Sequence, residues 1–546
     1  MASGDLHVSS VVALAKVPRG VGTYFRENSE SLALGYLASA LRRAGHDTIV
    51  FDGALRGLPL DQAQRELLTL VENKIPGLVG FTIADATYLE PTFSSIQLLR
   101  GAGYAGHITI GGHAPTFNYL GTLTMSPGLD SVVRFEGERT LVELVRRLGR
   151  GEGWRSCPGI AYRASDGAVQ ANPPECPEQD LDSYAWPARD YLPYVLDELR
   201  DIGIVAMAGS RGCYQNCGFC SIRRFYDIPG CAPWRQRSVG DIFAEIDSLM
   251  AQRPDIREIV FVDDIFTGPA GIRKRRLAQF EDAVAAYPWK LMFSISERVD
   301  NIDEETAASL RRIGVRQVLL GLESGDPEIL KTMNKHIDIN DHRRAIDLLR
   351  KNGIDNACAF ITFTPWSTLE QIRHDAHYFH DLGINVIQGL FNRFQVYDGT
   401  PIADELRREG RVVGEFPHFD FVSSDPRCDK AYALLCRHCG VVLELAYKLK
   451  RVERELRFAS FEAESTGGAA ASREIGETAS AYWSCHRGVM RDVVKLFDAI
   501  LDLADTDTTI EDSERTLSRQ VQSLFDPWMD IVCCFLGSNS RYLSAV

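Results

Sequence analysis

The chain has 546 residues, 45% of them hydrophobic and 25% charged, with a formal net charge of −14. A chain this long exceeds what one hydrophobic core organises, so we expect roughly three to four domains of about 150 residues. The scattered, net negative charge excludes the basic footprint of a nucleic-acid-binding protein. No stretch approaches the roughly 20 apolar residues of a membrane span, and no basic segment precedes the first apolar run as in a signal peptide. We therefore expect a cytoplasmic protein with no membrane partner.

Residues 1–150 alternate short apolar runs with amphipathic stretches. Strands separated by helices predict a doubly wound, flavodoxin-like parallel sheet, whose ligands bind at the carboxyl ends of the strands. Those ends carry small or polar residues here, namely Thr82, Gly111-Gly112-His113 and Glu136-Gly137-Glu138. The predicted strands are 8–15, 48–51, 78–83, 108–110 and 131–135, and the predicted helices are 32–43, 61–72 and 140–148.

Residues 151–200 are rich in Pro, Asp and Gly, which predicts a small hairpin and an irregular linker between two domains. In residues 201–405 the alternation resumes, and six βα units predict a partial (β/α)6 TIM-like barrel with its catalytic residues at the C-terminal ends of the strands. The predicted strands are 204–208, 258–262, 291–295, 317–320, 357–362 and 385–390, with helices such as 239–252 and 304–313 between them.

Residues 406–546 predict a mostly helical C-terminal domain, which we interpret as a substrate cap or a packing domain. Helices are expected over 430–457 and 486–503, separated by the low-complexity stretch 460–472, which predicts a mobile loop. The cysteines of this part, in Cys436-Arg437-His438-Cys439 and in Cys533-Cys534, lie in helical or apolar patterns and are interpreted as ordinary thiols.

Cys213, Cys217 and Cys220 follow the first predicted barrel strand with the spacing Cys-x3-Cys-x2-Cys. Three thiolates on one loop can hold three corners of a [4Fe-4S] cluster and leave the fourth iron open to another ligand. The alternative, a structural zinc site, needs four ligands around one ion, and Cys231 is a weak candidate for the fourth.

This loop, with the segments that follow the later strands, resembles the radical S-adenosylmethionine superfamily. In that family an aromatic residue precedes the third cysteine, a Ser and an Arg approach the methionine carboxylate, and a Glu binds the ribose hydroxyls. For Arg298 or Glu323 alone, a surface salt bridge would be the ordinary interpretation. The chain departs from the family at Thr364-Pro365-Trp366, where Gly-x-Pro-Gly is frequent. The resemblance implies S-adenosylmethionine contacts from Phe219, Asp264, Ser296, Arg298, Glu323 and Thr362.

Residues 1–150 resemble the cobalamin-binding domain that precedes the barrel in one subfamily. The stretches 29–45, 111–115 and 130–138 carry the resemblance. The Asp-x-His-x-x-Gly signature is absent, so no lower axial ligand of cobalt is assigned, and His113 either reaches the corrin or caps its own loop. A cofactor-free flavodoxin-like domain is the alternative. The implied cobalamin contacts are Ser31, Leu34, Thr82, Gly111, Gly112, His113, Glu136 and Gly137.

The resemblance implies a cobalamin-dependent radical S-adenosylmethionine enzyme. Such an enzyme forms a 5′-deoxyadenosyl radical, abstracts hydrogen from an unactivated carbon and transfers a methyl group from methylcobalamin. We expect a C-methyltransferase that acts on a small-molecule intermediate, as in antibiotic biosynthesis, with an external electron donor such as flavodoxin or ferredoxin. Two alternatives stay open: a cyclase or rearrangement enzyme with the same cofactors, and a redox-responsive protein that binds cobalamin and a cluster.

Overall fold

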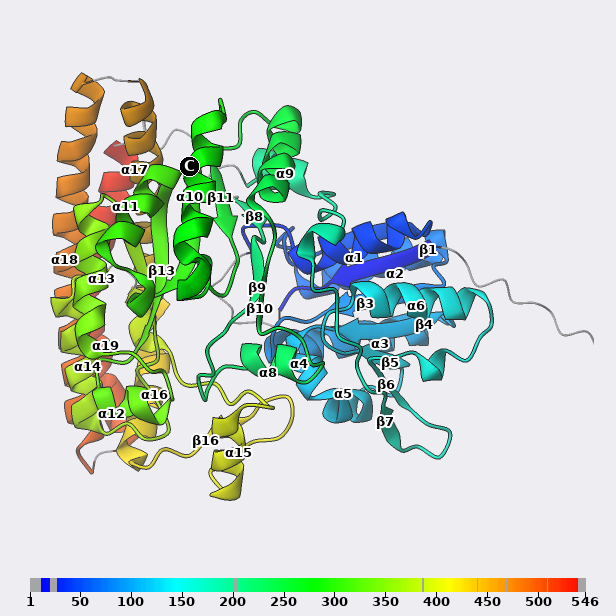
Figure 1. Ribbon diagram of the computed structural model, residues 1–546. Helices are drawn as coiled ribbons and strands as arrows, with labels where there is room; N and C mark the ends of the chain where they lie inside the picture. The colour runs from blue at the N-terminus through cyan, green and yellow to red at the C-terminus, as the bar shows by residue number, and fades with distance from the viewer. Residues whose placement is uncertain are drawn as a thin grey trace, which may run out of the picture.

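A computed structural model describes residues 11–19, 27–199, 204–384, 387–438, 440–466, 469–507 and 509–538. Three parts lie next to one another (Figure 1). The N-terminal sheet and its helices, blue to cyan, form one end, and a second α/β unit, green, lies in the middle. Long helices, orange to red, cover the far side of the middle unit. The three parts correspond to three stretches of the sequence in chain order.

The N-terminal sheet has the strand order β2-β1-β3-β4-β5-β6-β7, in which β1 to β5 are parallel. The order 2-1-3-4-5 is the flavodoxin-like order, so that prediction is confirmed. The predicted hairpin pairs antiparallel with β5 and continues this sheet. Residues 8–10 of the first predicted strand lie outside the described residues. The strands are β1 (Val11–Lys16), β2 (Asp47–Asp52), β3 (Leu78–Thr82), β4 (His107–Gly111), β5 (Ser131–Val133), β6 (Ile160–Arg163) and β7 (Val169–Ala171).

Helices cover both faces of this sheet, which explains why β1, β3 and β4 are almost continuously buried. On one face lie α1 and α6, which pack on each other; on the other face lie α2 and α3. Ser31 is the N-cap of α1 and accepts a hydrogen bond from the Leu34 amide. The helices of this domain are α1 (Leu32–Arg43), α2 (Leu60–Lys74), α3 (Leu89–Gly101), α4 (His113–Phe117), α5 (Tyr119–Met125) and α6 (Glu138–Gly149).

The middle unit has a parallel sheet of five strands in the order β14-β13-β12-β11-β8. The sixth predicted strand is wrong for the residues that the structure describes, because Ile387–Phe391 forms the 3-10 helix η5. Ile387 and Leu390 are both buried, and a spacing of three residues puts them on one side of a 3-10 turn. The strands are β8 (Val205–Met207), β11 (Glu258–Phe261), β12 (Met292–Arg298), β13 (Val315–Glu323) and β14 (Asp355–Phe360).

Helices cover the outside of this five-stranded sheet, as expected for a partial barrel. The predicted helices over 239–252 and 304–313 have the bounds that the structure shows. The short strands β9 (Ser210–Gly212) and β10 (Trp234–Gln236) pair antiparallel beside it. The helices are α7 (Leu192–Asp197), α8 (Ile222–Asp227), α9 (Val239–Gln252), α10 (Ala270–Ala286), α11 (Glu304–Ile313), α12 (Pro327–Thr332), α13 (Ile339–Lys351), α14 (Leu369–Asp381) and α15 (Pro401–Arg408).

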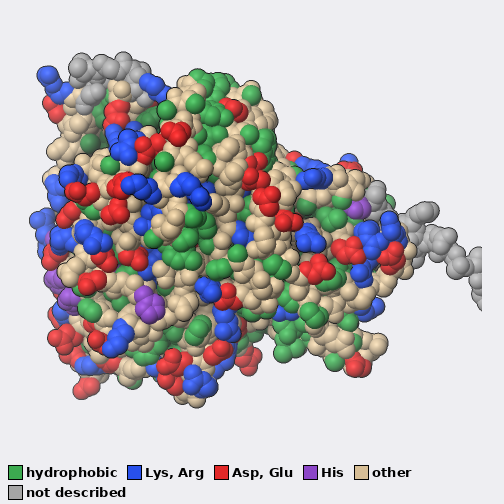
Figure 2. Space-filling view, in the orientation of Figure 1, with side chains coloured by type: hydrophobic (Ala, Val, Ile, Leu, Met, Phe, Trp, Pro, Cys, Tyr) green, Lys and Arg blue, Asp and Glu red, His purple; other side chains and the backbone are tan. Residues whose placement is uncertain are grey.

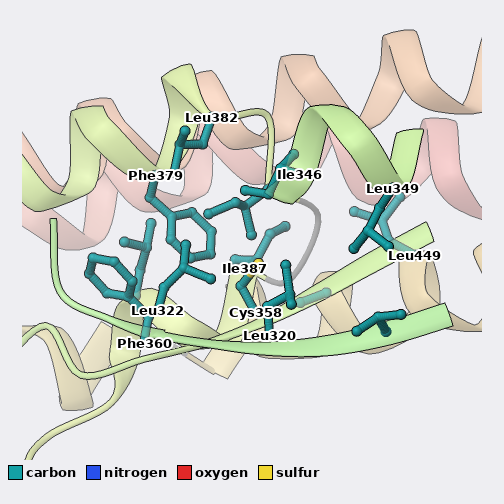
Figure 3. Packing of buried hydrophobic residues seen from close by; sticks show 14 of the residues in the cluster. Leu320, Leu322, Ile346, Leu349, Cys358, Phe360, Phe379, Leu382, Ile387 and Leu449 are labelled. Carbon is teal, nitrogen blue, oxygen red and sulfur yellow. The ribbon is translucent and has the colours of Figure 1, made fainter. Parts of the chain in front are cut away.

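The barrel and the C-terminal helices share one hydrophobic core. In Figure 3, Leu320 and Leu322 of β13 and Phe360 of β14 point toward the helices that cover the sheet. Leu449 of the C-terminal part belongs to the same buried cluster. Because these side chains are withdrawn from water together, the C-terminal helices stabilise the barrel.

Four long helices make up most of the C-terminal part. The mobile loop predicted over 460–472 is wrong, since its described residues belong to α17 and α18; residues 467–468 lie outside the description. Alanine is the strongest helix former, and Ala469–Ala471 continue the helical pattern. The helices are α16 (Pro426–His438), α17 (Gly440–Thr466), α18 (Ala469–Ala504) and α19 (Ile510–Ser538), and the strands β15 (Val412–Val413) and β16 (Asp420–Phe421) precede them.

The cysteines of this part do not form a described metal site. Cys436 is exposed, whereas Cys439 and the side chains of Cys533 and Cys534 lie outside the described residues. Basic and acidic side chains are interspersed over the face seen in Figure 2. Within the part of the chain that the structure describes, no helix is both long and apolar enough to cross a membrane.

Candidate active site between the two sheets

A cavity of about 380 Å³ opens at the carboxyl ends of β1, β3, β4 and β5. Its wall contains Leu34, Thr82, Gly111, Gly112, His113, Glu136 and Gly137, all of them predicted cobalamin contacts. Ser31 is the exception, because its side chain caps α1. The sheet therefore gathers side chains from four separate segments of the sequence around one space.

The inner end of this cavity lies between the sheet and the helices α1 and α6, and sequence reasoning missed the residues there. Leu14, Gly80, Thr109 and Leu141 line it. A Cβ at Gly80 would lie 3.1 Å from Leu14 Cδ2, so a side chain there would narrow the slot. Gly80 could have indicated this part of the cavity from the sequence, because a glycine inside an otherwise apolar strand often marks the close approach of a ligand.

Gly112 shows why glycines stand at these strand ends. Its φ is +118°, and a Cβ would lie 2.0 Å from the Ile83 carbonyl oxygen. No other residue fits this position without moving the backbone. The bare backbone at Gly111 and Gly112 lets a flat ligand approach the strand ends closely, so this wall fits the corrin of cobalamin.

His113 follows directly and stacks on Phe225 of α8, with ring centroids 4.1 Å apart. Gly112, rather than His113, is the N-cap of α4. Burial lowers the pKa of His113 to about 4, so its imidazole is neutral near pH 7. The ring lies where the first cavity meets a second one.

The second cavity, of about 780 Å³, lies between the N-terminal domain and the barrel. Ala84, Asp85, Ala86 and Thr87 line one side, and Phe219, Cys220 and Ser221 of the cysteine loop line another. A third wall comes from residues 393–398 and 416–420. The cavity thus joins the end of β3 to the cysteine loop.

The cysteine loop leaves β9 and is anchored by Asp263, which follows β11. The Asp263 carboxylate accepts hydrogen bonds from the Gly209 amide and the Ser210 hydroxyl, both at 2.7 Å. On the other side of the loop, the Gly218 amide donates to the Met333 carbonyl at 2.8 Å. Both ends of the loop are therefore held by barrel residues.

The thiols of this loop are enclosed. Burial raises the pKa of Cys213 to about 11 and that of Cys220 to about 12, so their ionisation needs a nearby cation such as iron. Among the described residues, no three Cys, His, Asp or Glu side chains converge as the ligands of one metal ion. A cubane cluster binds each of three cysteines to a different iron atom and leaves the fourth iron open, and this loop supplies three such thiolates.

Arg298 and Glu323, two of the predicted S-adenosylmethionine contacts, are both buried, and Arg298 pairs with the partly exposed Asp300 at 2.9 Å. Arg298 Nη1 lies 3.9 Å from Cys217 Sγ. Glu323 ends β13 and accepts a hydrogen bond from Lys335 Nζ at 2.6 Å. A guanidinium fork beside the cluster loop fits a carboxylate, and the glutamate fits vicinal hydroxyls.

The other predicted contacts lie at strand ends as well. Ser296 is in β12, and its carbonyl accepts a hydrogen bond from the Phe266 amide. Thr362 is buried just after β14, and Phe219 lines the second cavity. Asp264 opens onto the first cavity instead, where burial, followed by the charge of Asp263, raises its pKa to about 6. Asp264 is thus the member of the set that faces the N-terminal domain.

This arrangement places a loop that fits an iron–sulfur cluster at the mouth of a partial barrel, opposite a second domain whose cavity has a glycine wall that fits a corrin. A family model described as the radical SAM superfamily matches residues 207–379, and one described as a B12 binding domain matches residues 18–145. The chain belongs to the cobalamin-dependent radical S-adenosylmethionine enzymes. Its cofactors are a [4Fe-4S] cluster, S-adenosylmethionine and cobalamin.

Two similar proteins are named as a methyltransferase and as a cyclase. An uncharacterized methyltransferase of Pyrococcus horikoshii is 29% identical over 387 residues, which cover 70% of this chain and 79% of that protein. The anaerobic magnesium-protoporphyrin IX monomethyl ester cyclase of Rubrivivax gelatinosus is 28% identical over 402 residues, covering 71% and 68%. Proteins that are named for different reactions are therefore similar to this chain over most of its length.

Solved structures show the same fold. The cobalamin-dependent S-adenosylmethionine radical enzyme OxsB with aqua-cobalamin bound has a TM-score of 0.69 at 18% identity, covering 94% of this chain and 84% of that one. The radical S-adenosylmethionine methyltransferase TsrM from Kitasatospora setae has a TM-score of 0.60 at 21% identity, covering 73% and 78%. At these identities the likeness concerns the fold.

Proposed function

We propose that this enzyme is a C-methyltransferase that acts on an unactivated carbon of a small-molecule biosynthetic intermediate. The observation that supports the proposal is the second cavity, which is lined by Phe219 and Cys220 of the cluster loop and by Ala84 to Thr87 of the B12-binding domain. A substrate in this space would contact both cofactor sites. When bound, the cluster and S-adenosylmethionine supply the hydrogen-abstracting radical, and cobalamin supplies the methyl group.

The protein's own residues then have binding and orienting roles. Cys213, Cys217 and Cys220 would hold the cluster, Arg298 and Ser296 the methionine carboxylate, and Glu323 the ribose hydroxyls. Phe219 and Thr362 would enclose the adenosine part of S-adenosylmethionine. The second cavity has both apolar and polar walls. With cofactors and substrate bound, exclusion of bulk water from it would protect radical chemistry from side reactions.

The cobalamin contacts remain proposals of the same kind. Leu34, Thr82, Gly111, Gly112, Glu136 and Gly137 would form the cofactor's cavity. His113 is neutral and faces both cavities, so it is available to the corrin without the desolvation penalty of a charge. An external donor such as flavodoxin or ferredoxin would reduce the cluster, and the enzyme would work in the cytoplasm.

The second candidate is a radical cyclase or rearrangement enzyme with the same cofactors. Two relatives that are named as cyclases, at 28% and 27% identity, favour this second candidate. A methyltransferase forms S-adenosylhomocysteine together with its methylated product, whereas a cyclase does not need to. The third alternative, a redox-responsive binding protein, would form no 5′-deoxyadenosine.

The test is product analysis of the anaerobically reconstituted full chain with cobalamin, S-adenosylmethionine, a chemical reductant and candidate acceptors. We expect 5′-deoxyadenosine and S-adenosylhomocysteine to appear together with a product heavier by one methylene unit. Turnover of an acceptor with 5′-deoxyadenosine but without S-adenosylhomocysteine would contradict methyl transfer and support the cyclase. Binding of all cofactors with no 5′-deoxyadenosine would support the binding protein.

A further inference from the structure

The segment Met333-Asn334-Lys335-His336, between α12 and α13, contacts the cluster loop and both of the buried S-adenosylmethionine residues. We propose that Lys335 is a positioning residue that holds Glu323 and, through its backbone, Arg298 in the geometry that binds S-adenosylmethionine. The inference rests on the proposed roles of Glu323 and Arg298. It assigns a role to a residue that does not itself line the second cavity, although its ammonium lies over the ring of Phe219, 5.8 Å from the centroid.

The side chain of Lys335 is 6% exposed and that of Glu323 is 9% exposed. The two form an ion pair at 2.6 Å between Nζ and Oε1. A buried ammonium or carboxylate without its partner is strongly unfavourable, so each holds the other in place. Lys335 bonds Oε1, and Oε2 stays available as an acceptor for the ribose hydroxyls.

The backbone around this pair is adapted to it. Glu323 has a φ of +69°, a left-handed conformation that is unusual for a residue other than glycine. A Cβ at Gly321 would lie 2.7 Å from Glu323 Oε1 and 2.8 Å from Lys335 Nζ. Glycine at position 321 therefore leaves the room in which the ion pair forms.

The backbone of the same segment, together with the Asp300 carboxylate, orients Arg298. Arg298 Nη2 donates to the Lys335 carbonyl at 3.0 Å and to the His336 carbonyl at 3.4 Å. Asn334 and His336 have φ values of +53° and +52°, which turn the chain sharply on both sides of Lys335. The lysine thus links a carboxylate and a guanidinium from two neighbouring strands.

The segment also contacts the cluster loop at two points. The Met333 carbonyl accepts the Gly218 amide at 2.8 Å, and Asn334 Nδ2 donates to the Asn216 carbonyl at 2.9 Å. These contacts use backbone and Asn334 atoms, whereas the Lys335 side chain meets the loop at the ring of Phe219, a proposed S-adenosylmethionine contact and not a cluster ligand. Substituting the lysine should therefore disturb S-adenosylmethionine binding more than cluster binding.

The test compares Lys335→Met with Lys331→Met in the full reconstituted enzyme. Methionine keeps most of the length of the lysine side chain but carries no charge. Lys331, four residues earlier on α12, is the control because its side chain is 79% exposed. The readouts are iron content, the electron paramagnetic resonance spectrum of the reduced cluster with and without S-adenosylmethionine, and the KM for S-adenosylmethionine in 5′-deoxyadenosine formation. None of these depends on whether methyl transfer follows.

For Lys335→Met we expect unchanged iron content and a KM raised about 10- to 100-fold, the range for residues that orient a ligating group. A correspondingly higher concentration of S-adenosylmethionine should be needed to change the electron paramagnetic resonance spectrum of the cluster. Lys331→Met should match the parent enzyme. An unchanged KM in Lys335→Met would overturn the proposal.

A double variant separates positioning from general damage to the fold. Glu323→Gln removes the carboxylate that Lys335 is proposed to hold, so adding Lys335→Met to it should raise the KM little further. Removing both charges also avoids an uncompensated buried ion, which favours folding of the double variant. If Lys335→Met raises the KM by the same factor in both backgrounds, the lysine does not act through Glu323.

Discussion

Arg211, two residues before Cys213, donates a hydrogen bond to Glu138 Oε1 at 2.8 Å, although Glu138 begins α6 in the B12-binding domain. Arg211 also pairs with Glu136 at 3.2 Å, and Arg235 pairs with the same carboxylate. All four side chains are largely buried. The strand that leads into the cluster loop is therefore bonded directly to the wall of the cobalamin cavity.

Arg211→Met should destabilise the contact between the two domains. The substitution removes the described partner of the buried Glu138 carboxylate. Breaking a buried ion pair in this way lowers the free energy of unfolding by about 3–5 kcal/mol. The measurement is the free energy of unfolding in denaturant. The control is Arg223→Met, which removes a partly exposed pair with Asp227 on α8 and should cost less than about 1 kcal/mol. Equal losses in the two variants would contradict the role of the network.

Cys213→Ala, Cys217→Ala and Cys220→Ala should each abolish iron binding after anaerobic reconstitution. The parent should hold about four iron atoms, because three thiolates on one loop hold the cubane. Iron content and the visible absorbance of the cluster report the result. Cys436→Ala, at an exposed position on α16, should leave both unchanged. Retained S-adenosylmethionine cleavage in a loop variant would refute the assignment of the cluster.

Gly112→Ala should abolish cobalamin binding. An added Cβ would lie 2.0 Å from the Ile83 carbonyl oxygen in a backbone conformation that only glycine adopts easily, so the strand ends at the cavity must shift. Gly101→Ala is the matched control, since a Cβ at Gly101 meets nothing within 4 Å. Equilibrium dialysis with hydroxocobalamin measures the difference, and equal binding by the two variants would argue against a cofactor at these glycines.

Stability should fall as the pH is lowered from about 6.5 to about 4. Burial lowers the pKa of His107 and of His342 to about 4, whereas histidines in the unfolded chain titrate near 6.5. Between these values the unfolded chain binds protons that the folded protein does not, so the stabilisation present above pH 6.5 is lost toward pH 4. Each histidine contributes a slope of up to about 1.4 kcal/mol per pH unit.

Unfolding in denaturant at several pH values tests this slope. His107→Asn replaces a titrating ring that bonds Ser131 Oγ with an amide that does not titrate, and it should make the pH dependence shallower. His377→Asn, at an exposed position on α14, should leave the slope as it is. Identical slopes in the parent and His107→Asn would show that this histidine is not buried in its neutral form.

Local patterns were sufficient for most of the fold. Helices α1, α9 and α11 begin and end where the sequence predicts, because caps such as Ser31, Ser238 and Asp303 mark their first turns. The two failures have different causes. The stretch around 387–390 became a 3-10 turn against the barrel core. At Ala469, where α18 begins, the local helix propensity of alanine outweighed the low complexity that predicted a loop.

The sequence by itself determined the chemistry of the cluster loop, because it depends on residue types at short spacings, whereas S-adenosylmethionine and cobalamin followed from the resemblance to the radical S-adenosylmethionine family. Cys213, Cys217 and Cys220 lie within eight residues of one another. Only the tertiary structure decided that Lys335 holds Glu323, that Arg211 joins the two domains, and that Gly80 opens a slot beneath the strand ends. Those relationships join residues far apart in the chain, and such contacts follow from how buried charges and backbones meet in space rather than from any local pattern.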